Sequence, residues 1–243
     1  MTQDDNVQVT EWDRECMAWH EAGHAVCAVM LPGHGRVERI SIVPGDDAFG
    51  SMRTEVGRDH NATEQALMGM VATELAGVVC ERMFLDRATT SGGQDLAAAY
   101  GLASDMVVRF GMGGHIGLAC PGHSPDETRS QFIAGDSRRV AGDIRDIIFT
   151  AKGLTEKTLS RNKDKVKAVA RALLRCGTLD GETFYREMQM KDTGNASVAN
   201  DGKGSGIAGK IANALLWLLV ALAVIGLFAY IIAQAISVSF KGA

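Results

Sequence analysis

Apolar residues recur at helical spacing over most of the first 190 residues, and polar or glycine-rich breaks divide the chain into elements. This pattern predicts helices over 17–31, 63–84, 94–110, 126–152 and 155–176, and a short last helix near residue 180. Residues 37–42 and 49–56 read as two strands joined by a Pro-Gly-Asp-Asp turn. The predicted fold is mainly α with a small β-hairpin.

The end of the chain has a different pattern. No charged residue lies between Lys210 and Lys241, and residues 211–236 consist mainly of Leu, Ala, Val and Ile. A stretch of this length can cross a bilayer of roughly 30 Å as a helix. We therefore predict an N-terminal tail at 1–11, a folded domain at 12–190, a flexible linker at 191–209, one transmembrane helix at 210–238 and a tail at 239–243.

Charge and cysteine content narrow the class of protein. The formal net charge of −4 gives no reason to expect a nucleic-acid partner. The five cysteines are scattered and odd in number, which argues against a disulfide framework and favours a reducing compartment. No signal peptide precedes the domain, and Lys203 and Lys210 come before the span, so we expect a single-pass protein with its domain in the cytoplasm.

The most informative stretch is His20-Glu21-Ala22-Gly23-His24, inside the first predicted helix. Residues four apart share a helical face, so both imidazoles can reach one metal ion. Glu21 follows the first histidine and can act as general base toward the attacking water. Two histidines and a carboxylate suit zinc, which makes His20 and His24 candidate ligands and Glu21 the candidate catalytic residue.

A protease zinc site needs a third protein ligand. The metzincin pattern is excluded because Cys27 and Met30 stand where a glycine and a histidine would follow. Glu74 is conceivable as a ligand from a later helix, but its Asn-Glu context is missing. The better candidate is Asp95, which follows a loop of small residues near the start of a helix.

Several separated motifs resemble one family. The sequences 20–25, 90–96 and 106–112, in this order, are similar to the peptidase domain of the FtsH family of membrane-bound AAA+ proteases, and the likeness covers about residues 12–190. The resemblance implies a zincin-type helical metallopeptidase in a bacterial inner membrane, with Zn²⁺ held by His20, His24 and Asp95. It also implies a ring-shaped homo-oligomer, a hexamer in that family, and substrate added to a sheet edge at Phe49, Gly50, Ser51 and Met52.

The departures from the family change the expected function. That family places an ATPase module before the peptidase, where this chain has about eleven residues. Gly204, Gly209 and Lys210 have phosphate-loop spacing, but Ile211 offers no hydroxyl for magnesium. We therefore expect a metalloendopeptidase that cleaves unfolded or flexible polypeptides without an ATPase of its own, or with a separate AAA+ partner.

Two other functions stay open at this point. The chain could be a membrane-tethered adaptor or regulator of a full-length FtsH-type protease, although a regulator has no need of Glu21. The sequence Leu179-Asp180-Gly181 also resembles the second metal motif of intramembrane site-2 proteases, but charged residues surround it and the predicted span follows it.

Overall fold

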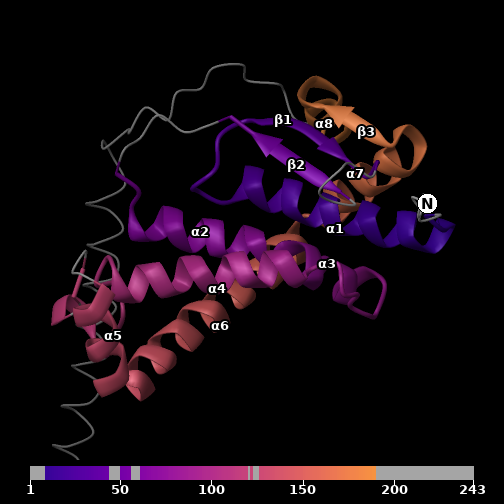
Figure 1. The fold of residues 1–243 in the computed structure, drawn as a ribbon. Coiled ribbons are helices and arrows are strands. Elements are labelled where there is room, and N and C mark those ends of the chain that lie inside the picture. Colours follow the sequence, from indigo (N-terminus) through magenta and orange to yellow (C-terminus); the bar gives the residue numbers. More distant parts are fainter. Residues whose placement is uncertain (1–8, 44–49, 56–60, 120, 123–125, 190–243) are drawn as a thin grey trace, which may run out of the picture. The chain divides into compact units, whose positions relative to one another are not determined.

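The computed structural model describes residues 9–43, 50–55, 61–119, 121–122 and 126–189. All of them belong to one compact unit, residues 1–192. The prediction of a mainly helical domain with a small sheet is confirmed (Figure 1). In chain order the elements are α1 (Glu11–Met30), β1 (Val37–Ser41), β2 (Ser51–Thr54), α2 (Glu64–Glu74), α3 (Ala76–Phe84), α4 (Gly93–Val108), the short 3-10 helix η1 (Gly117–Ala119), α5 (Asp126–Gly135), α6 (Ser137–Arg161), α7 (Lys163–Cys176), β3 (Thr178–Asp180) and α8 (Gly181–Glu187).

Helix α1 is the centre of the domain. It starts six residues before the predicted helix because Thr10 and Asp13 form a reciprocal capping box. Every residue from His20 to Ala28 is buried, so this part of α1 is enclosed on all sides rather than along one stripe. Helices α3 and α7 make its most extensive contacts, and the sheet lies along it as well (Figure 1).

The predicted hairpin is present as antiparallel β1 and β2, with Ile40 opposite Met52 and Ser41 opposite Ser51. A third strand, β3, pairs with the other side of β1, which gives the order β2-β1-β3. The sequence pattern does not predict β3, because three residues are too few to show a period. This order leaves β2 at the edge of the described sheet.

Several predicted helix boundaries are wrong, including breaks at Asp136 and Asn162, on either side of α6, that the sequence pattern does not predict. The helix expected over 63–84 is two helices that meet at Leu75, although Thr63 caps the first of them as expected. The boundary expected near residue 153 is absent, because α6 continues through Gly153 and ends at Arg161. Ala151, Thr155 and Leu159 are buried at four-residue spacing, so packing of one continuous face outweighs the low helix propensity of a single glycine.

A buried carboxylate fixes the loop that follows α4. The side chain of Asp143, on α6, accepts hydrogen bonds from the backbone N–H groups of His115 and Ile116 at 2.9–3.0 Å. Burial opposes ionisation of Asp143, but these bonds and one from the His115 ring outweigh it and hold its pKa below the ordinary value. The loop is thereby tied to α6.

The predicted linker at 191–209 and the predicted span at 210–238 lie outside the described residues. Within the ranges that the structure describes, no helix combines the length and the apolar composition needed to cross a bilayer.

Candidate metal centre

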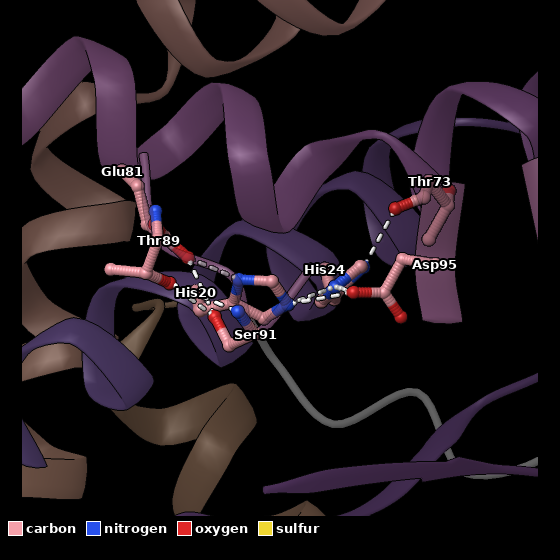
Figure 2. A network of polar contacts seen from close by, with 7 residues as sticks. All are labelled: His20, His24, Thr73, Glu81, Thr89, Ser91 and Asp95. Carbon is pink, nitrogen blue, oxygen red and sulfur yellow. Dashed lines mark hydrogen bonds and ion pairs between the residues drawn. The ribbon is translucent and has the colours of Figure 1, made fainter. Parts of the chain in front are cut away.

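His20 and His24 lie one turn apart on α1 and are 6% and 7% exposed. Their Nε2 atoms face each other at 3.0 Å (Figure 2). The structure therefore brings together the two histidines that the sequence proposed as ligands.

Asp95 approaches both rings from the first turn of α4. Its Oδ2 lies 2.9 Å from His20 Nε2 and 3.6 Å from His24 Nε2 (Figure 2). Burial opposes ionisation of Asp95, but hydrogen bonds and charge from the two histidines hold its pKa well below the ordinary value. Asp95 is thus a carboxylate with an oxygen beside both imidazoles.

The other ring nitrogens have acceptors of their own. His20 Nδ1 lies 2.6 Å from Glu81 Oε1, and His24 Nδ1 lies 2.7 Å from the backbone carbonyl of Thr73. An acceptor at Nδ1 requires the proton there, which leaves the Nε2 lone pair of each ring directed at the shared space. These contacts are drawn in Figure 2.

Glu81 is a site residue that the sequence motifs do not predict. Its side chain is fully buried, and its second oxygen accepts the backbone N–H of Thr89 at 2.6 Å. The Ser91 hydroxyl donates to Oε1 at 3.2 Å. The sequence did contain a signal for this role: Glu81 is a lone glutamate among the apolar residues of α3. Such a position predicts a buried carboxylate, and a buried carboxylate needs hydrogen-bond partners.

The donor set fits a small cation. Two Nε2 lone pairs and a carboxylate oxygen within 2.9–3.6 Å of one another repel unless a positive charge lies between them. A tetrahedral zinc site with bonds of about 2.0–2.1 Å would hold its ligands roughly 3.3 Å apart. Without a metal, a proton on His20 supplies the positive charge between these atoms. Burial opposes the charge on His20, but hydrogen bonds with Asp95 and Glu81 outweigh this effect and raise the pKa of His20 to about 9.

Glu21 is 8% exposed and occupies the position between the histidines and the start of β2. Burial raises the pKa of Glu21, although the neighbouring histidines counteract part of this effect. A Cβ on Gly50 would lie 2.4 Å from Glu21 Oε1, so the glycine lets the backbone pass against the carboxylate. Gly50, the residue that precedes β2, therefore lies directly beside the candidate base.

The remaining predicted site residues are placed as follows. Ser51 and Met52 belong to the edge strand β2, next to Gly50, whereas Phe49 lies outside the described residues. Glu74, the other candidate ligand, is not part of the group formed by His20, His24 and Asp95. The Asp180 side chain accepts the Thr183 N–H at 2.8 Å as the N-cap of α8, which accounts for it without a metal.

One further group of potential ligands exists in the described part of the chain: His115, Asp143 and Asp146. Both oxygens of Asp143 already accept the backbone N–H groups of the loop after α4. This carboxylate therefore serves the fold, and the centre on α1 is the better candidate for a metal.

Comparison with known proteins now identifies the family. Residues 7–186 match the model of peptidase family M41. The chain belongs to peptidase family M41. This M41 chain is 31% identical over 215 residues to the ATP-dependent zinc metalloprotease FtsH 2 of Alkaliphilus metalliredigens (strain QYMF), an alignment that covers 84% of this chain and 30% of that protein.

Other M41 relatives give the same result. The FtsH proteins of Caldicellulosiruptor bescii and Paraburkholderia phymatum are each 33% identical to it, over 73% and 81% of this chain. The alignments cover 30% and 32% of those proteins, so the chain spans about a third of the length of the curated relatives it matches. These relatives are named zinc metalloproteases, and the Zn²⁺ cofactor predicted from the sequence is confirmed.

Proposed function

We propose that this chain is a zinc-dependent endopeptidase, attached to a membrane, that hydrolyses peptide bonds of unfolded or flexible polypeptides. The observation that carries the proposal is the convergence of His20 Nε2, His24 Nε2 and Asp95 Oδ2 beside a buried Glu21. Family membership and the zinc metalloproteases among its relatives support the same chemistry.

In this proposal His20, His24 and Asp95 hold the ion, and Glu81 and the Thr73 carbonyl hold the two rings in the required tautomer and orientation. Zinc, when bound, supplies Lewis acidity to the scissile carbonyl and to water. Glu21 accepts the proton of the attacking water and delivers it to the leaving amine. Burial raises the pKa of Glu21, which makes its carboxylate a stronger base toward the attacking water.

Substrate would bind along β2. This strand is at the edge of the described sheet, and it begins beside Glu21 at Gly50. An extended polypeptide can add to such an edge through backbone hydrogen bonds. A flexible segment can adopt this extended conformation without first unfolding, so its free-energy cost is small. Unfolded proteins are therefore the proposed substrates. Phe49, Gly50, Ser51 and Met52 stay our candidates for contact with substrate.

The test uses the complete 243-residue chain in detergent, loaded with zinc, without ATP. We expect cleavage of a permanently unfolded, fluorescently labelled protein, and little cleavage of the same protein in its folded form. Glu21→Gln should bind zinc normally and cleave nothing, because the ligands remain and only the base is lost.

The same pair of variants tests the rival function. Normal zinc content without cleavage in both wild type and Glu21→Gln would refute an independent peptidase. An AAA+ partner protease would then be added, and equal modulation of its activity by wild type and Glu21→Gln would establish an adaptor. Restored cleavage by the wild type alone would instead show a peptidase that depends on a separate ATPase.

A further inference from the structure

A strongly basic stripe runs along α7, away from the metal centre. Lys163, Lys167, Arg171 and Arg175 are all exposed and follow one another at four-residue spacing. On an α-helix, each such step turns by about 40°, so the four side chains share one side of α7 over roughly 18 Å. The opposite side of α7 is apolar and buried, largely against α1.

The charge of this region is opposite to that of the chain. Residues 157–175 hold seven lysines and arginines and a single carboxylate, Asp164, which is a net charge of +6. The whole chain has a formal net charge of −4, so the remaining residues together carry −10. Closely spaced cations repel one another, which is unfavourable for an isolated domain. The same row of cations becomes favourable beside an extended anionic partner.

The last described helix lies at one end of this stripe. Arg175 Nη2 donates to Glu187 Oε1 of α8 at 3.0 Å, so the domain ends beside the basic side chains. The predicted span begins at about position 210, and a flexible linker of that length, as predicted from the sequence, would have an end-to-end distance of roughly 25–30 Å. A bilayer that holds the span would therefore lie within reach of the stripe.

We propose that the basic stripe of α7, formed by Lys163, Lys167, Arg171 and Arg175, docks on the anionic headgroups of the membrane to which the chain is attached. A row of exposed cations without aromatic residues on α7 fits a surface of repeated negative charge better than stacked bases, which require aromatic platforms. The inference rests on the proposed membrane attachment, and it adds a fixed orientation of the peptidase domain on the bilayer.

The experiment reconstitutes the complete chain with vesicles of phosphatidylcholine alone, or of phosphatidylcholine mixed with phosphatidylglycerol. Flotation of the vesicles reports attachment. Trace acylation of lysines, followed by mass spectrometry, reports docking at Lys163 and Lys167, with Lys152 on α6 as internal reference. Each basic residue beside an anionic surface contributes roughly fivefold to binding, so we expect acylation of both lysines to fall about fivefold or more on the anionic vesicles.

Two matched variants test the role of charge while keeping the reporter lysines. The double variant Arg171→Glu with Arg175→Gln should lose the protection, and Arg138→Glu with Arg145→Gln, an equal charge change elsewhere on α6, should keep it. High salt should also abolish the protection, because exposed charges are screened.

The other possible results separate docking of the stripe from membrane attachment of the chain. Flotation without lysine protection on anionic vesicles refutes docking and leaves membrane attachment intact, whereas absence of flotation refutes both. Protection by a single-stranded oligonucleotide in solution, and not by anionic vesicles, would replace the membrane by nucleic acid as the partner of the stripe. None of these outcomes depends on turnover, so they are independent of the peptidase test.

Discussion

Replacing Glu81 by glutamine tests whether the metal centre depends on the group that orients His20. Glu81 is fully buried and accepts His20 Nδ1–H at 2.6 Å on one oxygen and the Thr89 N–H at 2.6 Å on the other. Burial opposes its ionisation, but the bonds from His20 and Thr89 hold its pKa below the ordinary value. With the Ser91 hydroxyl, which also donates to Oε1 at 3.2 Å, three donors share the two oxygens of one carboxylate.

Glutamine preserves the shape and removes one of these acceptors. Its amide has one oxygen, so either the His20 ring or the Thr89 N–H must face an NH₂ group. A hydrogen bond to a charged group contributes about 1.5–3 kcal/mol, so we expect the free energy of unfolding of the metal-free chain to fall by about 2–3 kcal/mol. Because His20 also loses its fixed orientation, the zinc dissociation constant should rise about 10- to 100-fold.

The two effects are measured separately. Competition with a chromophoric chelator gives the zinc dissociation constant, and urea denaturation of the metal-free chain gives the stability. Glu156→Gln is the control, because Glu156 forms an exposed ion pair with Lys152 on α6, and loss of that pair should cost less than about 1 kcal/mol. Unchanged zinc affinity in Glu81→Gln would refute the view that this carboxylate supports the site.

Three further predictions concern the site and its surroundings. Gly50→Ala places a Cβ 2.4 Å from Glu21 Oε1, so turnover should fall about tenfold or more while zinc content, measured by atomic absorption, stays unchanged. Asp143→Asn should lower the free energy of unfolding by about 2 kcal/mol at pH 7. In urea titrations this difference should shrink as the pH falls below about 4, because a carboxylate with a depressed pKa stabilises the fold only while it is ionised. Zinc must displace a proton from His20, whose pKa is raised to about 9, so chelator competition should show affinity rising with pH by nearly tenfold per unit up to that value. The proton on His20 stabilises the metal-free fold below about pH 6.5, and this contribution should disappear as the pH rises through 9.

The elements with strong periodicity could be predicted, and the boundaries set by packing could not. Thr63 marked the start of α2 because a cap is a local signal. The break at Leu75 has no such signal, since apolar residues continue from α2 into α3. The helix end expected after residue 152 is absent, because the buried face of α6 continues on both sides of Gly153.

The sequence by itself determined the two candidate histidine ligands and the candidate base, because His20, Glu21 and His24 are held in register by a single helix. It also determined the basic character of α7, since charge spacing along one helix is a local property. The sequence favoured Asp95 over Glu74, and the tertiary structure decided between them: Asp95 is 71 residues beyond His24, and the packing of α4 on α2 and α6 brings it to 2.9 Å from His20. The same holds for Glu81, Gly50 and the edge position of β2. Each of these depends on contacts between distant segments, which hydrophobic periodicity does not encode.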